Sequence, residues 1–214
     1  MSMKITVFGA NNMVGKRLVR QALARGWEVI AFDRNIESLL DTDHLNEQLD
    51  AMKGYLFDDN AIANAIKDAD AVVSAINGSF DGTDLSRSLG TKHLITQMEK
   101  HGIKRIVSLG GAAVLDTGNG HYLLDTPEYP MGLIPIAQEH MLVYLYFKSS
   151  SLDWKLVCPL YISDTDGRRR YNAAPDKLPS NGSEEIAAGD IADCMLNLLE
   201  NDRYLHQRIG ITPA

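Results

Sequence analysis

The sequence predicts a doubly wound α/β fold, in which a parallel sheet lies between two layers of helices. Three observations carry this prediction. Short apolar runs alternate with longer helical patterns, a glycine-containing turn follows the first apolar run directly, and an acidic residue ends the second run. We expect residues 1–214 to form a single domain, because a chain of this length suits one hydrophobic core.

The apolar runs predict six strands. They cover residues 5–8, 29–32, 51–53, 71–75, 105–109 and 154–158. Between the first two runs, Val14, Leu18 and Ala22 recur at helical spacing, and Gly26 is placed to end that helix. Later helices are predicted over 61–66, 85–100 and 134–150, and a last one from Asp190.

Composition limits the classes of partner. The net charge is −7, which opposes binding to nucleic acid or to an anionic membrane surface. No segment has the length and apolarity of a signal peptide or membrane helix, so we expect a cytoplasmic protein. Cys158 and Cys194 match no metal-ligand spacing, and we expect two buried thiols and no metal site.

The turn after the first strand has the features of a dinucleotide-binding loop. Its candidate cofactor-binding residues are Gly9, Asn11, Asn12, Met13, Val14 and Gly15. Glycine suits this turn because the backbone must take positive φ and approach a pyrophosphate at a helix N-terminus. Ala75, Ile76 and Asn77 follow the fourth strand at the same edge of the sheet, where the cofactor must pass.

The second strand ends in Asp33-Arg34. A carboxylate at this position accepts hydrogen bonds from the adenosine ribose hydroxyls, which favours NAD. A guanidinium can instead pair with the 2′-phosphate of NADP. The sequence therefore predicts NADP or NAD as cofactor and leaves the choice open.

Two long segments, 111–133 and 159–188, are rich in glycine, proline, aspartate and asparagine and break the βα rhythm. We expect the substrate pocket between them, within a small C-terminal region. The expected partner is a small-molecule acceptor, and a homodimer is left open.

The runs 9–34, 71–75, 105–112 and 152–159 resemble an atypical short-chain dehydrogenase/reductase. Within that superfamily the chain is most similar to the NAD(P)H-binding group that includes biliverdin reductase B, NADH-flavin reductases and NmrA-like proteins. The resemblance implies a Rossmann-like fold. Asn11 and Asn12 replace a threonine and a glycine of the usual loop, and we expect asparagine to tolerate its left-handed φ. Gly54-Tyr55 replaces the usual Gly-Asp, while Asp58 remains a candidate cofactor contact.

Many reductases of that superfamily use a Tyr-x-x-x-Lys pair, and Tyr144 and Lys148 match its spacing. Counting back from Pro159, however, the resemblance places the pair at Ile136 and His140. We therefore expect a solvated Lys148, and we retain His140 and Tyr144 as candidate catalytic residues. The serine position reads Gly110-Gly111.

Further pocket candidates carry weaker signals. They are His121, Tyr122 and the basic run Arg168, Arg169 and Arg170, which could clamp an anionic acceptor.

Without the usual pair, the predicted reaction is hydride transfer from NAD(P)H to a conjugated, flavin-like or quinone-like acceptor, since such a ring delocalises the charge it receives. One alternative is an NmrA-type redox sensor that binds the dinucleotide without turnover and regulates a protein partner. A second alternative is an epimerase or dehydratase.

Overall fold

The computed structural model describes residues 2–36, 47–180 and 183–214, and their strands form one large sheet and one small one. The large sheet has the order β3-β2-β1-β4-β5-β6-β10-β8, and the small sheet pairs β7 with β9. The strands are β1 (Lys4–Phe8), β2 (Glu28–Asp33), β3 (Leu49–Lys53), β4 (Ala71–Ser74), β5 (Arg105–Leu109), β6 (Asp153–Pro159), β7 (Tyr161–Ser163), β8 (Tyr171–Pro175), β9 (Glu185–Ala187) and β10 (Gln207–Pro213). All six predicted strands are confirmed.

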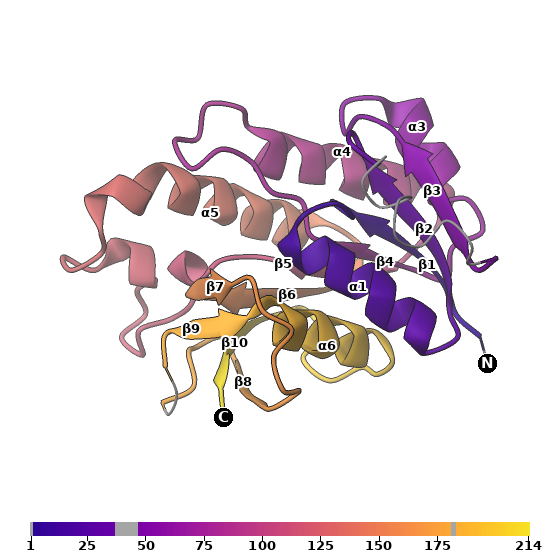
Figure 1. The fold of residues 1–214 in the computed structure, drawn as a ribbon. Helices are drawn as coiled ribbons and strands as arrows, with labels where there is room; N and C mark the ends of the chain where they lie inside the picture. Colours follow the sequence, from indigo (N-terminus) through magenta and orange to yellow (C-terminus); the bar gives the residue numbers. More distant parts are fainter. Residues whose placement is uncertain (1, 37–46, 181–182) are drawn as a thin grey trace.

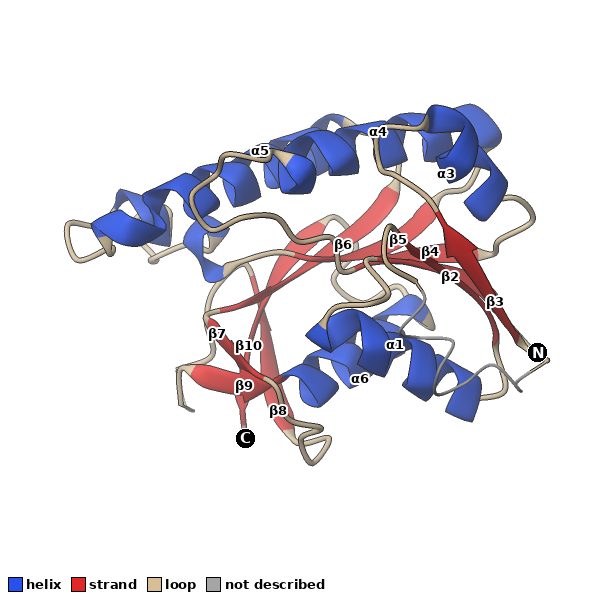
Figure 2. Ribbon diagram, turned by 45° about the horizontal axis from the view of Figure 1, so that its top comes forward, coloured by secondary structure: helices blue, strands red, loops and turns tan. Residues whose placement is uncertain are grey.

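Helices cover both faces of the large sheet. Figure 2 shows α3, α4 and α5 on one face and α1 and α6 on the other. The α-helices are α1 (Met13–Ala24), α3 (Asp59–Ala65), α4 (Ser86–His101), α5 (Ile134–Ser149) and α6 (Ala188–Leu199). The predicted three-layer, Rossmann-like arrangement is confirmed, and each predicted helix is present with its ends shifted by about two residues.

The order of the sheet reverses between β1 and β4. The chain runs outward from β1 to β2 and β3, returns to β4 on the other side of β1, and continues to β5 and β6. Ligands of such sheets bind at this reversal, outside the carboxyl ends of the strands. The fold therefore places the glycine loop and the segment after β4 side by side.

The last strand lies inside the sheet. β10 runs parallel to β6 and antiparallel to β8 (Figure 1). The sequence patterns do not predict β7 to β10. The segment 111–133, expected as loop, contains three short 3₁₀ turns: η1 (Ala112–Val114), η2 (Leu123–Asp125) and η3 (Met131–Leu133).

The core explains why these segments are strands and helices. β1, β2 and β4 to β6 are almost continuously buried because helices cover both faces of the sheet. On α1 the stripe of Val14, Leu18 and Ala22 is buried as predicted and packs with α6. Cys158 and Cys194 are buried free thiols, also as predicted. No helix within the described residues is long and apolar enough to cross a membrane.

Candidate functional site

The glycine loop requires glycine at Gly9, directly after β1, and at Gly15, in the first turn of α1. Gly9 has φ +73°, and a Cβ there would lie 2.6 Å from the carbonyl oxygen of Ala75. A Cβ on Gly15 would collide with the carbonyl oxygen of Gly9. Because glycine has no Cβ, the loop can lie close against the end of β4. The outer side of the loop is also clear of side chains at these two positions.

The two asparagines of the loop do not take left-handed φ, so that expectation is wrong. Asn12 is extended, with φ −83° and ψ 177°, and is the N-cap of α1. Its side-chain oxygen accepts hydrogen bonds from the backbone N–H groups of Val14 (3.0 Å) and Gly15 (2.9 Å). Its amide nitrogen donates to the carbonyl oxygen of Ala75 at 2.5 Å. Asn12 therefore preserves the turn by capping the helix and tying it to β4.

Asp33 is fixed at the end of β2. Its carboxylate accepts one hydrogen bond from the backbone N–H of Asn11 (3.1 Å) and one from that of Asn35 (3.0 Å). Together with Gly9 and Arg34, Asp33 lines a small cavity of about 100 Å³. Each carboxylate oxygen keeps lone-pair capacity for a ribose hydroxyl. This is the position that the glycine-loop pattern assigns to adenosine.

Asp58, another candidate cofactor contact, caps a helix and lies outside the residues that line either cavity, so its contact with the cofactor stays a prediction. Its carboxylate accepts hydrogen bonds from the backbone N–H groups of Asn60 (3.0 Å) and Ala61 (3.1 Å) at the start of α3. Tyr55, Leu56 and Phe57 line the small cavity instead. The glycine before them, Gly54, is needed because a Cβ there would collide with the ring of Phe32.

A second, larger cavity of about 850 Å³ opens in front of β4, β5 and β6. It is lined by the start of α1 (Asn12, Met13, Val14), the segment after β4 (Ala75, Ile76, Asn77, Gly78, Phe80), Arg87, Leu109, Gly110, Gly111, Ile136, His140, Pro159, Leu160, Tyr161, Ile162, Ser183, Glu184 and Glu185. The expected segment 159–188 thus supplies much of the wall, whereas 111–133 supplies Gly111 alone.

Ile136 and His140 both face this cavity, as the count from Pro159 predicts. The imidazole of His140 lies against Gly111, where a Cβ would be 2.7 Å from its Cδ2 atom. Its Nδ1 atom is buried and has no hydrogen-bond partner among the described residues. Burial, and secondarily the positive charge of Arg87, lower the pKa of His140 from 6.5 to about 3. His140 is therefore neutral at physiological pH.

Tyr144 lies outside the residues that line either cavity, contrary to the expectation that it could line the pocket. Its ring packs edge-on against Tyr122 and Trp154 and lies 4.7 Å from the guanidinium of Arg208. Burial raises the pKa of Tyr144. Lys148 is exposed at the end of α5, as expected, with its Nζ 5.9 Å from the ring of Tyr144.

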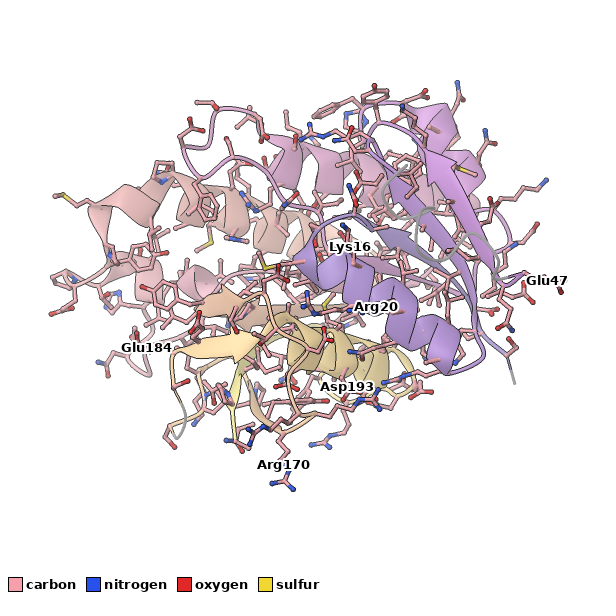
Figure 3. All side chains as sticks on the ribbon, in the orientation of Figure 1. Lys16, Arg20, Glu47, Arg170, Glu184 and Asp193 are labelled. Carbon is pink, nitrogen blue, oxygen red and sulfur yellow. The ribbon has the colours of Figure 1, made fainter. Side chains whose placement is uncertain are left out.

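The weaker pocket candidates also lie elsewhere. His121 is exposed, and Tyr122 packs on Tyr144. The run Arg168, Arg169 and Arg170 precedes β8, and in Figure 3 Arg170 projects away from the molecule, beyond the labelled Asp193 of α6. Within the described residues, none of these side chains lines the large cavity, so the suggestion that they clamp an acceptor there is wrong.

The sequence reasoning missed Arg87, in the first turn of α4. Its side chain is 6% exposed and lines the large cavity. An arginine in the first turn of a predicted helix is usually solvated, so only the packing of α4 against α5 could reveal its burial. Glu139 on α5 is buried as well and accepts a hydrogen bond from the backbone N–H of Ser88 (3.0 Å).

The two cavities fit the two ends of a dinucleotide. Both are lined by Ile76 and Asn77, so they adjoin across the reversal of the sheet. The glycine loop and the N-terminus of α1 lie between Asp33 and the large cavity, where a pyrophosphate needs close backbone approach. Asp33 is placed to hold the adenosine ribose, and the large cavity has room for the nicotinamide and an acceptor.

A family model described as NAD(P)H-binding matches residues 9–202. The chain belongs to this NAD(P)H-binding family. The match begins at the first glycine of the loop and spans every element from α1 to α6. The resemblance seen in the sequence and the expectation of a nicotinamide dinucleotide are thereby confirmed, while the preference between NAD and NADP stays a prediction.

Relatives cover the whole chain. The uncharacterized protein YwnB of Bacillus subtilis (strain 168) is 29% identical over 98% of both chains. The structure of a proposed epimerase from Bacteroides thetaiotaomicron is 28% identical, has a TM-score of 0.84 and covers 100% of this chain and 98% of its own. That of a proposed NADH-flavin reductase from Streptococcus pneumoniae TIGR4 is 24% identical, with a TM-score of 0.83 and 100% coverage of both chains. These names differ, so the reaction must be argued from the site.

Proposed function

We propose that this protein is an NAD(P)H-dependent oxidoreductase that reduces a flat, conjugated acceptor of the flavin or quinone type. The observation that carries the proposal is the uncharged His140 in the large cavity beside the dinucleotide groove. The bound cofactor would supply the hydride. The protein's own residues would hold the two rings together and exclude water.

The reacting side of the cavity is poor in proton donors. Gly110 and Gly111 provide no hydroxyl, Tyr144 is turned into an aromatic cluster, and His140 is not a cation. Reduction of an isolated ketone develops an alkoxide that needs a proton donor of suitable pKa. A conjugated ring spreads the same charge over several atoms, and a neutral imidazole can still donate one hydrogen bond to it. The site therefore favours the conjugated class.

The walls suit a flat ring. Val14, which is buried, and Leu109 and Ile136, which are partly buried, provide apolar surface. Two exposed aromatic side chains, Phe80 (72% exposed) and Tyr161 (45%), line the same cavity, where a planar ligand can cover them.

Oxidation of NADH and NADPH at 340 nm, under anaerobic conditions, tests the proposal. FMN, FAD and a simple quinone are compared with an aliphatic ketone of similar concentration. We expect turnover with at least one conjugated acceptor and at least a hundredfold lower kcat/KM for the ketone. Faster ketone reduction would contradict the proposal. Tight cofactor binding with no turnover of any acceptor would instead favour the redox-sensor alternative.

A further inference from the structure

The large cavity contains a buried cation. The guanidinium of Arg87 donates one hydrogen bond, from Nη2 to the carbonyl oxygen of Gly78 at 3.3 Å. Its Nη1 atom is buried and has no hydrogen-bond partner among the described residues. A buried donor that lacks a partner costs free energy, more so on a charged group. Arg87 lines the cavity, so a ligand that reaches its guanidinium there would supply the missing partner.

The charge of Arg87 is compensated only at a distance. Across residues 2–36, 47–180 and 183–214, no carboxylate lies within 4.0 Å of its guanidinium. Glu139 and Asp84 act on it electrostatically, yet their carboxylates accept backbone N–H groups: that of Ser88 for Glu139, and those of Ser79 and Ser86 for Asp84. Burial lowers the pKa of Arg87, but arginine stays charged in proteins.

A second buried atom without a partner among the described residues, Nδ1 of His140, belongs to a residue that lines the same cavity. Arg87 is close enough to His140 to help lower its pKa. The cavity thus has one cationic donor and one neutral nitrogen among apolar walls. The carboxylates of Glu184 and Glu185, which line the same cavity, belong to exposed residues around β9, where solvent screens them (Figure 3 labels Glu184).

We propose that Arg87 binds an anionic oxygen of the acceptor, so the acceptor is a ring compound that carries a carboxylate or an ionised enol or phenol. This inference rests on the proposed function, since it assumes that the large cavity holds the acceptor beside the cofactor. Arg87 is placed to give its ligand a charge-assisted hydrogen bond in a site of low dielectric. It would therefore select anionic rings over neutral rings of the same shape.

Matched probes test the selection without requiring turnover. Calorimetry compares 2-naphthoate with the neutral 2-naphthamide, first on the protein alone and then on the protein saturated with oxidised cofactor. We expect the carboxylate to bind at least tenfold more tightly than the amide in both states. Equal affinities, or no binding of the carboxylate at millimolar concentration, would overturn the proposal. A preference that disappears with cofactor bound would assign Arg87 to a cofactor phosphate and would overturn it too.

Two variants assign the effect to Arg87. Arg87→Gln keeps a donor but removes the charge, and we expect it to abolish the preference for the carboxylate. Arg170→Gln is the control, because Arg170 is exposed and lies outside both cavities. If the Gln variant does not fold, Arg87→Lys replaces it, with an expected loss of at least threefold in naphthoate affinity. Unchanged selection in the folded variant would overturn the proposal.

The calorimetry and the turnover measurements at 340 nm together separate this inference from the proposed function. Turnover of conjugated acceptors that does not depend on Arg87 would support the reductase function and contradict the anion site. An anion preference that depends on Arg87, without turnover of any acceptor, would support the anion site and contradict the reductase function.

Discussion

At the scale of single residues, Asn12 shows how a loop can lose a glycine and keep its shape. The usual loop has a flexible glycine at this position. Here the Asn12 side chain keeps the shape of the loop by capping α1 and by donating a hydrogen bond to the carbonyl oxygen of Ala75. We expect Asn12→Ala to lower the free energy of unfolding by about 1–2 kcal/mol, the usual value of an N-cap, and to weaken cofactor binding. Urea unfolding and calorimetry with NADPH measure the two effects.

The control for Asn12 separates its two hydrogen-bonding roles. Asn12→Asp keeps an oxygen that caps the helix but removes the amide that donates to Ala75. We expect this variant to keep most of the stability while still losing cofactor affinity, since a carboxylate would also face the pyrophosphate. Equal stability of the Ala variant and the wild type would contradict the capping role.

His140 carries a prediction for pH. Its pKa is about 3 in the folded protein and 6.5 for an unperturbed side chain. Between these values the unfolded chain binds more protons, so this residue's contribution to stability is lost as the pH falls from about 6.5 toward 3, by at most about 1.4 kcal/mol per pH unit. Urea unfolding at several pH values should show a shallower acid loss for His140→Gln than for the wild type. Parallel curves would contradict a depressed pKa.

Asp33 and Arg34 carry a prediction for cofactor choice. Both line the small cavity, and the Asp33 carboxylate is already oriented by two backbone N–H groups. Asp33→Ala should weaken NADH more than NADPH, whereas Arg34→Ala should weaken NADPH more, each by about 1–3 kcal/mol as for hydrogen bonds to charged groups. Calorimetry with both cofactors measures the four affinities. Equal losses for both cofactors would show that neither side chain contacts the 2′ position.

At the scale of elements, α5 divides its residues between the cavity and the core. Ile136 and His140 face the cavity, while one turn later Tyr144 packs on Trp154. We therefore expect Tyr144→Phe and Lys148→Ala to change kcat/KM by less than tenfold, below about 1.4 kcal/mol of transition-state stabilisation. The measurement is steady-state kinetics, followed by NAD(P)H oxidation at 340 nm, with the acceptor that the earlier assay identifies. A thousandfold loss in Lys148→Ala with normal cofactor affinity would restore the usual pair.

At the scale of the whole molecule, Arg208 of β10 joins parts that lie far apart in the sequence. Its guanidinium donates to Asp176 (3.0 Å), to Asp116 (3.1 Å) and to the carbonyl oxygen of Val114, and it contacts the rings of Tyr122 and Tyr144. Arg208→Leu should lower the free energy of unfolding by about 1.5–3 kcal/mol. Arg170→Leu, at an exposed position, should change it by less than about 0.5 kcal/mol.

Some strands of the sheet could be predicted from the sequence and others could not. β1, β2 and β4 to β6 could be predicted because burial on both faces gives apolar runs with helical patterns between them. β8 and β10 could not, because polar residues or glycine interrupt the apolar residues of Tyr171–Pro175 and Gln207–Pro213, and their pairing is long-range.

Some features of the candidate site could likewise be predicted from the sequence. Gly9, Gly15 and Asp33 follow a motif of fixed spacing, and His140 follows from a count along the chain. Two other features depend on tertiary packing, which no local pattern records: the burial of Arg87 and the packing of Tyr144 away from the cavity. The capping role of Asp58 is local, since its carboxylate accepts the N–H groups of the residues two and three positions later.

The position of β10 affects how the chain can fold during synthesis. β1 to β5 pair with strands that the ribosome has already released or soon releases, so the glycine-loop half can assemble early. β6 and β8 remain without the strand between them until Gln207–Pro213 have been made. Until then each presents an unpaired edge, the kind of surface at which nascent chains aggregate. β10 is therefore the strand that joins β8 to the rest of the sheet.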